Sequence, residues 1–359
     1  MSKQDDGSEY SQAPKPTTVP HLTGNAPKIG GLVKQEIEDF EVDEIPAYEP
    51  SGEGPHIYLR VEKRNVDGRS MIEEVSGYFD IRVADIGTAG TKDRRAVTRQ
   101  WISVPADGVD KMPAEETEIA DGITVLKVSR HKNKLRTGHL RGNRFRVVIR
   151  DTELKGPQCE EAVGRIAGRI QDEGLPNFYG TQRFGDSGST LKAGWKWVRE
   201  GRAPKGRFLR RMAASALQSE VFNRVLARRL GEDTWRTVID GDIFEKVDTG
   251  GRFWIQPPER EETQRRLDAK EISVTGPMPG SRDGLASGTT GELEREILAE
   301  LEIDEDDLKV FGRGGRGTRR PLTIFIDDLS WEVESDSVNL EFTLPSGTYA
   351  TVLLREFTG

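Results

Sequence analysis

The chain has 359 residues, of which 34% are hydrophobic, and a formal net charge of -8. This length allows two moderate cores, because a typical domain has about 150 residues. The single cysteine, Cys159, excludes an intramolecular disulfide and a thiolate zinc cluster, and four histidines leave little material for a His-rich metal site or a Ser-His-Asp system. No apolar run reaches the about 20 residues that span a bilayer, and the N-terminus lacks the apolar core of a signal peptide. We therefore expect a soluble, cytoplasmic protein with no membrane partner.

The first half of the chain predicts a mostly stranded unit. Residues 1–28 are polar, rich in Pro, Gly and Ser and without periodicity, which predicts a disordered tail. Apolar and polar residues then alternate as in half-buried strands, and two segments carry the spacing of amphipathic helices. The predicted strands cover 40–46, 56–63, 99–104, 122–130 and 143–151, and the predicted helices cover 71–79 and 160–174.

Beyond Gly174 the pattern changes. A glycine-rich segment without a clean period precedes a helix predicted over 214–230, and residues 230–320 carry little readable pattern. Strand alternation returns in 338–357, which predicts a β-hairpin or strand pair. We therefore expect an α+β (mixed α/β) fold: a discontinuous domain, 29–176 and 321–359, with a largely antiparallel sheet, interrupted by a mostly α-helical insertion, 177–320.

Basic residues are concentrated in two stretches. Residues 127–150 hold nine Lys or Arg and no acid, and residues 192–211 hold eight with one acid, Glu200, whereas acids collect near 291–308. Such asymmetry is typical of a protein with one polyanion-binding face. The alternative is ordinary charged helices whose acidic partners lie elsewhere in the sequence.

One short segment concentrates charge at a turn. In "TAGTKDRRAVTRQW", residues 88–101, a single carboxylate, Asp93, stands between basic side chains ahead of a predicted strand. Taken alone, this pattern favours a solvated surface turn, since exposed ion pairs contribute little.

Three separated segments give this turn a second interpretation. "AGTKDRRAVTRQW", "GLPNFYGTQRFG" and "FTLPSGTYATVLLRE" resemble signature segments of the TruD family of tRNA pseudouridine synthases. "EDFEVDE", "SGEGPHIYLRVEK" and "RHKNKLRTGHLRGNRF" are similar to the family in the right order. The resemblance covers roughly residues 29–359 and is weakest between 230 and 320.

The resemblance implies an isomerase that converts uridine 13 of tRNA to pseudouridine, with no cofactor and no metal. Asp93 matches the family's catalytic aspartate, and a carboxylate is ionised at neutral pH without a helper base. Lys92 and Arg94 beside it would keep the carboxylate ionised and attract phosphates. The residues leave open whether Asp93 attacks the sugar C1′ or the base C6, and which group removes the C5 proton.

The resemblance also implies a pocket for a base that has left its stack. Phe40, Phe145 and Tyr349 match the family's active-site aromatic positions, Asn143 matches its uracil-contacting asparagine, and Lys34 falls where the family has a basic residue. The family often has Phe where Tyr349 stands, but stacking survives this change. Without the resemblance, a Phe in an alternating strand predicts core packing, and Lys34 predicts an exposed strand lysine.

The expected partner is tRNA, held through phosphate contacts of the acid-free stretch. Lys132, Lys134, Arg136 and Arg141 are the candidates in that stretch. Arg183, together with Asn177, either shapes the wall of the RNA cleft or only forms the tight backbone of a domain junction. The sequence does not fix the oligomeric state, and a monomer is favoured.

Two rival functions use the same residues. A non-catalytic RNA-binding protein on the same scaffold would not need Asp93. A hydrolase acting on nucleosides or sugars through an Asp would release free uracil, but the turn at Asp93 shows no second carboxylate to serve as the partner acid.

Overall fold

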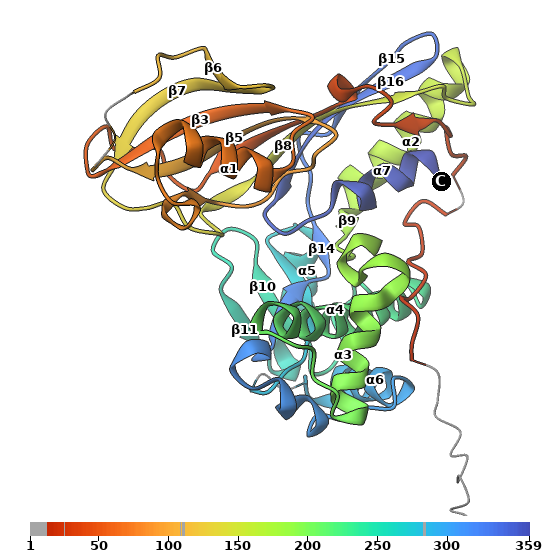
Figure 1. Ribbon diagram of the computed structural model, residues 1–359. Helices are drawn as coiled ribbons and strands as arrows, with labels where there is room; N and C mark the ends of the chain where they lie inside the picture. The colour runs from red at the N-terminus through yellow and green to blue at the C-terminus, as the bar shows by residue number, and fades with distance from the viewer. Residues whose placement is uncertain (1–12, 25, 108, 110–111, 283–284) are drawn as a thin grey trace, which may run out of the picture. The chain divides into compact units, whose positions relative to one another are not determined.

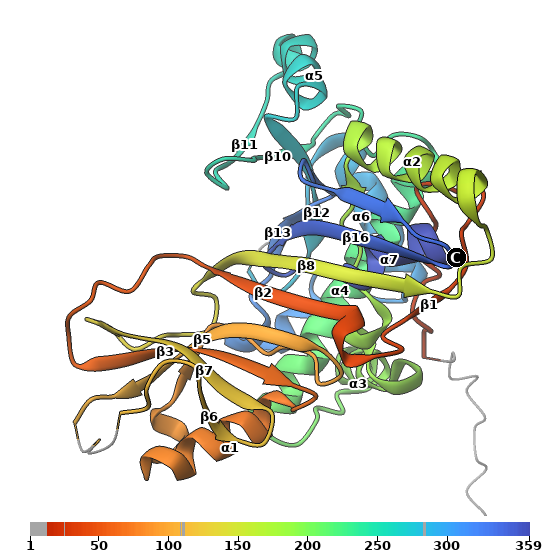
Figure 2. The same cartoon turned by 90° about the horizontal axis from the view of Figure 1, so that it is seen from above.

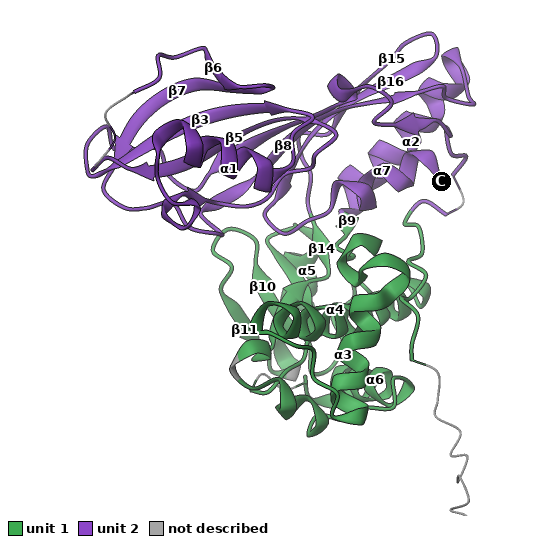
Figure 3. Cartoon of the chain, viewed as in Figure 1, with its two compact units in different colours: residues 1–22, 175–324 green, residues 23–174, 325–359 purple. Residues whose placement is uncertain are grey.

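The computed structural model describes residues 13–24, 26–107, 109, 112–282 and 285–359. The chain forms two compact units (Figure 3). We call residues 23–174 and 325–359 the sheet unit, and residues 1–22 and 175–324 the inserted unit. The sheet unit thus passes into the inserted unit between residues 174 and 175, and the chain returns between residues 324 and 325. The sequence predicts these boundaries after residues 176 and 320.

The sheet unit is built on one ten-stranded sheet with the order β15-β16-β8-β2-β5-β3-β7-β6, in which β1 also pairs with β8 and β4 with β5. All of these pairs are antiparallel except β2 with β5, so the expected α+β class with a largely antiparallel sheet is confirmed. Seen from above, β16, β8 and β2 run side by side (Figure 2). The strands are β1 (Leu32–Val33), β2 (Phe40–Pro46), β3 (His56–Arg64), β4 (Gly87–Thr88), β5 (Val97–Pro105), β6 (Thr117–Ala120), β7 (Ile123–His131), β8 (Leu140–Arg150), β15 (Ser330–Val333) and β16 (Ser337–Pro345).

Helix α1 (Gly68–Phe79) covers one face of this sheet (Figure 1). The carboxylate of Asp67 caps the helix by accepting from the backbone N–H groups of Arg69 and Ser70, both at 3.0 Å. The buried stripe of Met71, Val75 and Phe79 packs in one cluster with apolar residues of β3, β5 and β7. This packing forms a hydrophobic core between the helix and the sheet.

The C-terminal segment corrects one sequence expectation. β16 is followed by helix α7 (Ala350–Thr358), which with α2 (Gly156–Glu173) completes the sheet unit, so 338–357 is a strand and a helix and not a strand pair. The buried residues Val352, Leu353 and Phe357 have helical spacing. Because this segment is short and mostly apolar, its helical spacing cannot be distinguished from strand alternation in the sequence.

The inserted unit contains both helices and a sheet. Its helices are α3 (Ser189–Glu200), α4 (Arg207–Gly231), α5 (Arg260–Asp268) and α6 (Gly288–Glu300), and four strands pair in the order β11 (Arg252–Trp254), β10 (Ile243–Lys246), β12 (Ile272–Met278), β13 (Thr318–Pro321). The mostly α-helical expectation omitted this sheet. The central strand β12 is buried at every position and carries Gly276 and Pro277, so it lacks alternation and contains residues that argue against a strand.

The chain enters and leaves the inserted unit through adjacent segments. β9 (Leu175–Pro176) pairs antiparallel with β14 (Thr323–Ile324). Asn177 reinforces this junction, because its Nδ2 donates to the carbonyl of Pro321 at 2.9 Å and its Oδ1 accepts from Arg320. Both crossing segments are therefore held to each other within the inserted unit.

The second half of the expected disordered tail has a defined path, which corrects that prediction for residues 13–28, residue 25 excepted; residues 1–12 lie outside the described part of the chain. The backbone N–H of Thr17 donates to the carboxylate of Glu220 in α4. The hydroxyl of Thr23 donates to Oε2 of Glu356 in α7 at 2.7 Å. Specific hydrogen bonds without a repeating pattern hold this segment, so periodicity does not reveal it. Within the described residues, no helix combines the length and apolar character needed to cross a bilayer.

Candidate active site

Asp93 lies in the sheet unit, in the loop between β4 and β5. Its side chain is 50% exposed, and its Oδ2 accepts a hydrogen bond from Nζ of Lys34 at 2.7 Å. The loop follows the short strand β4 and leads straight into β5, whose Trp101 and neighbours are buried. The carboxylate is thus open to solvent on one side and paired with a cation on the other.

Lys34 connects this carboxylate to the aromatic residues. It follows β1 with a positive φ of 61°, and its Nζ lies 3.9 Å from the centroid of the Phe40 ring. A lysine ammonium over an aromatic face is attracted by the ring quadrupole. One ammonium group therefore touches both Asp93 and Phe40, so the acid and the ring belong to one local arrangement.

The aromatic residues form a row across three neighbouring strands. Phe40 of β2 and Phe145 of β8 meet edge to face with centroids 5.9 Å apart, and Phe145 stacks on Phe342 of β16 at 5.2 Å. Phe40 is 1% exposed and Phe145 is 7% exposed. Both rings are therefore buried in the wall of the site and do not offer an open surface for stacking. Sequence reasoning missed Phe342, which lies directly opposite Phe145 across the β8–β16 pair.

Asn143 lies on the same face of β8 as Phe145, two residues earlier. Its Cα pairs with Glu44 of β2 on one side and with Leu344 of β16 on the other. The side chain is half-buried, and its Oδ1, which is itself shielded from solvent, has no hydrogen-bond partner among the described residues. This oxygen can accept a hydrogen bond from a ligand that reaches the sheet face.

Close packing next to Asn143 requires a glycine. A Cβ at Gly142 would lie 2.3 Å from the carbonyl oxygen of Leu344. Any larger residue would push β16 away from β8 at this point, and the position of Asn143 would shift with it.

Tyr349 stands immediately before α7, as its N-terminal boundary residue, and is half-buried. The turn that carries it leaves β16 next to the start of β8, where the N–H of Ser346 donates to the carbonyl of Arg141 at 2.9 Å. The turn is thus tied to the strand that carries Asn143 and Phe145.

Two lysines beside Asp93 are buried, which differs from the sequence expectation for Lys92. The side chain of Lys92 is 5% exposed, and its Nζ lies 2.7 Å from Oε2 of Glu44, itself 1% exposed. Lys63 of β3 is fully buried and donates from Nζ to the backbone carbonyl of Asp93. Burial lowers the pKa of Lys63 to about 8; Lys92 and Lys34 add to the lowering, and Asp93 and Asp67 oppose it.

Sequence reasoning missed Glu44 and Lys63. Both are charged residues on the inward face of alternating strands, where an apolar residue is the ordinary choice. The signal available in the sequence is that their inward position breaks the alternation. Only the fold shows that the two side chains have partners.

The predicted RNA-binding residues of the sheet unit are distributed over its surface. Arg94, Arg136 and Arg141 are exposed, and Lys132 pairs with Glu53 at 2.9 Å, with both side chains largely exposed. Lys134 is half-buried and donates to the carbonyl of Ala84 at 2.7 Å. Four of these five are thus exposed, and Lys134 is partly committed to the protein itself.

Arg183 belongs to the inserted unit, where it is half-buried. Its guanidinium donates to Ser219 at 3.1 Å and to Ser215, and it lies 5.2 Å from the ring centroid of Tyr179. These contacts hold it against α4.

The basic stretch 192–211 presents cations at the start of α4. Arg207, Arg210 and Arg211 are exposed and form no ion pair with a described carboxylate, and Phe208 between them is 63% exposed. These residues line a hollow of about 650 Å³ in the inserted unit, and Trp197 and Phe311 form part of its wall. This surface combines unpaired cations with an accessible ring.

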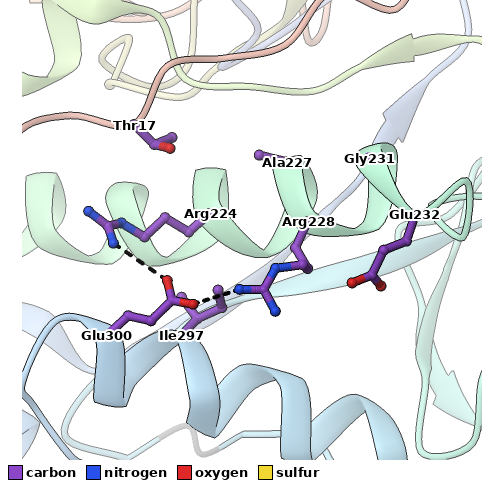
Figure 4. Close-up of a pocket in the computed structure, with 8 residues that line it drawn as sticks. All are labelled: Thr17, Arg224, Ala227, Arg228, Gly231, Glu232, Ile297 and Glu300. Carbon is purple, nitrogen blue, oxygen red and sulfur yellow. Dashed lines mark hydrogen bonds and ion pairs between the residues drawn. The ribbon is translucent and has the colours of Figure 1, made fainter.

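Another hollow of about 360 Å³ lies in the inserted unit between α4 and α6 (Figure 4). Three of its charges are paired with one another, because Glu300 lies 2.6 Å from Arg228 and 3.7 Å from Arg224. No group of three His, Cys, Asp or Glu side chains that could hold a metal occurs in the described part of the chain. The arrangement around Asp93, by contrast, combines an exposed carboxylate, the ammonium of Lys34 and, through that ammonium, the aromatic row that begins at Phe40.

Comparison with known proteins gives one consistent result. The family model for tRNA pseudouridine synthase D (TruD) matches residues 19–200 and 206–357. A tRNA pseudouridine synthase D of Anaeromyxobacter dehalogenans is 42% identical over 351 residues, covering 95% of this chain and 97% of the relative. One from Thermus thermophilus is 38% identical over 342 residues, covering 95% and 92%. A crystal structure of the putative tRNA pseudouridine synthase D of Methanosarcina mazei matches with a TM-score of 0.74 at 25% identity, covering 94% and 95%.

Proposed function

Because this chain belongs to the tRNA pseudouridine synthase D family, a family of isomerases, we propose that it converts uridine 13 of tRNA to pseudouridine with Asp93 as the catalytic carboxylate. The family supports tRNA as the substrate class. The choice of position 13 and the role of Asp93 are the finer parts of the proposal.

The observation that carries the proposal is the contact of Lys34 with both Asp93 and Phe40. Conversion of uridine to pseudouridine breaks the C1′–N1 bond, forms a C1′–C5 bond, removes the proton from C5 and returns a proton to N1. An exposed carboxylate can act in this sequence as a nucleophile or as a stabiliser of developing positive charge. Lys34 holds the carboxylate beside the Phe40 ring, next to the place where the base would lie.

The base has to leave the RNA stack before it can react, at a cost of a few kcal/mol. Asn143 and Tyr349 are half-buried and can meet an extruded base, whereas Phe40 and Phe145 support the site from behind. The free Oδ1 of Asn143 can accept from the N3–H of uracil. Tyr349 offers a ring for stacking.

We propose that phosphates are held by Arg94, Lys132, Lys134, Arg136 and Arg141 of the sheet unit, with Arg183 and the α4 arginines as contributors from the inserted unit. Lys92 does not belong to these phosphate-binding residues, because its ammonium is buried against Glu44. Recognition of A-form RNA relies mainly on shape and backbone, so exposed cations are sufficient for docking. Selection of the correct tRNA would then fall to the inserted unit.

The experiment is to incubate the protein with unmodified tRNA and to detect pseudouridine by carbodiimide block of reverse transcription. We expect a stop at position 13, and no stop there in a tRNA whose uridine 13 is replaced by cytidine. Stops only at other uridines would contradict the choice of position. Binding of tRNA without a stop at any uridine would contradict the enzymatic proposal and favour the non-catalytic RNA-binding alternative, and release of free uracil would favour a hydrolase.

A further inference from the structure

The loop that carries Asp93 is attached to the sheet by two buried ammonium groups. Lys63 donates to the backbone carbonyl of Asp93, and the neighbouring Lys92 is paired with Glu44 at 2.7 Å. Both lysine side chains are nearly or fully shielded from solvent. Burying a charge is costly unless it is paired and hydrogen-bonded. Two buried lysines beside one loop are therefore an uncommon arrangement, and both of them have partners in or next to that loop.

Glu44 provides a rigid anchor for Lys92. Besides the contact with Lys92, its Oε1 accepts from the backbone N–H of Trp101 in β5 at 3.1 Å. Glu44 itself lies on β2, and its Cα pairs with Asn143 of β8. The carboxylate of this β2 residue is therefore fixed against the neighbouring strand β5, and it fixes the residue that precedes Asp93.

These contacts hold Asp93 from three directions. Lys34 binds its carboxylate, Lys63 binds its carbonyl, and Lys92 ties the preceding residue to Glu44. The carbonyl and the preceding side chain together determine where the Cα of Asp93 lies and how its peptide is turned. Lys34 then determines where the carboxylate points.

On the basis of the proposed function, we infer that Lys63 and the Glu44–Lys92 pair are positioning residues that hold the Asp93 carboxylate in its reactive place. They act through Asp93 and do not touch the substrate. A displacement of about 1 Å at a reacting group can lower a rate by about 10²-fold. Loss of this attachment should therefore lower the chemical rate while leaving the binding of tRNA intact.

The test compares four forms of the full chain: wild type, Lys63→Met, Lys63→Arg, and the double variant Glu44→Gln/Lys92→Met. The double variant removes both charges together, so no buried charge is left unpaired, and the amide oxygen of the introduced glutamine can still accept from the N–H of Trp101. Single-turnover rates at saturating tRNA and the Kd for tRNA are measured separately. The control is Glu161→Gln/Arg165→Gln, which removes an exposed ion pair of the same unit.

We expect the rate to fall by at least about tenfold in Lys63→Met and in the double variant, with Kd within about twofold of wild type. Lys63→Arg, which keeps a charged donor, should recover part of the rate, and the control should match wild type. A folded double variant and a folded Lys63→Met that both react at the wild-type rate would overturn the inference. A weaker Kd with an unchanged saturated rate would also overturn it, by assigning these lysines to phosphate binding.

Failure of the inference is distinguishable from failure of the proposed function. If wild type forms no pseudouridine, the proposed function fails. If wild type is active and Asp93→Asn is not, the function stands and only the rates of the positioning variants decide the inference. Should the double variant not fold, Lys63→Met decides it by the same two measurements.

Discussion

The Nζ atom of Lys34 lies 2.7 Å from the Oδ2 atom of Asp93 and 3.9 Å from the centroid of the Phe40 ring.

We expect Asp93→Asn to lower single-turnover pseudouridine formation by at least about 10²–10³-fold, because a neutral amide supplies neither a nucleophile nor a full negative charge. The amide keeps the shape of the side chain, so the Kd for tRNA should not change. Asp85→Asn, in an exposed Arg82–Asp85 pair of the same unit, is the control and should remain active. A fully active Asp93→Asn would remove Asp93 from the mechanism.

Asn143→Ala should weaken recognition of the base. If Oδ1 accepts from uracil, its loss costs about 1–2 kcal/mol, which corresponds to about a five- to thirty-fold decrease in kcat/KM. Asn339→Ala is the matched control, since Asn339 lies on the neighbouring strand β16 and donates to the exposed residue Glu334. Equal kcat/KM values for the two variants would exclude Asn143 from uracil recognition.

The three unpaired arginines at the start of α4 should contribute to the affinity for tRNA. We expect the triple variant Arg207→Gln/Arg210→Gln/Arg211→Gln to raise the Kd and to reduce the slope of log K against log salt by about one for each phosphate that is no longer neutralised. The matched control is Arg165→Gln/Arg169→Gln/Arg265→Gln, which removes the same charge from arginines that are paired with carboxylates. Identical salt slopes for the two triple variants would exclude the α4 arginines from phosphate binding.

The pH dependence of stability should report on Lys63. Burial lowers the pKa of Lys63 from 10.5 to about 8 in the folded chain. Between these two values the unfolded chain binds a proton that the folded chain does not, so the contribution of Lys63 to the free energy of unfolding rises with pH in this window and is constant below it. Urea unfolding of wild type and Lys63→Met measures the difference across the window. A difference that does not change with pH would show that Lys63 keeps an ordinary pKa.

The core of the inserted unit contains a fully buried ion pair whose removal should be costly. Nη1 of Arg229 lies 2.6 Å from Oδ1 of Asp242, and the two side chains are 1% and 0% exposed. Arg229→Met leaves a buried carboxylate without its main partner and should lower the free energy of unfolding by about 3–5 kcal/mol. Arg229→Met/Asp242→Leu should recover part of this loss, because no charge remains unpaired. Urea unfolding checks both, and the loss expected for Arg265→Met, in an exposed pair, is below about 1 kcal/mol.

The sequence predicts the sheet unit well where one face of a strand is buried and the other is solvated. Alternation locates β2, β3 and β8, because each keeps most of its apolar residues on one buried face. It fails for β12, which is buried on both faces, and for α7, which is too short and too apolar for the helical period to stand out. Residues 13–28 escape prediction because isolated hydrogen bonds to Glu220 and Glu356 fix them.

The candidate site is predictable only in part. Resemblance to a family points to Asp93, Asn143 and the aromatic residues, and these remain predictions at the level of function. The roles of Lys63, Lys92 and Glu44 depend on contacts between residues far apart in the sequence, such as the 48 positions that separate Glu44 from Lys92. The sequence marks Lys92 as a basic residue in a polar turn, and only the fold shows that it faces inward.

The β9–β14 pair brings the two ends of segment 175–324 together. Leu175 and Ile324 are directly opposite each other, at the about 5 Å between Cα atoms that antiparallel partners have. A tight turn between residues 174 and 325 would therefore close the sheet unit without stretching the chain. The entropic cost of closing an insertion grows only slowly with its length. A scaffold with this junction can accept segments of very different size between the same two residues while the sheet that carries Asp93 is left as it is.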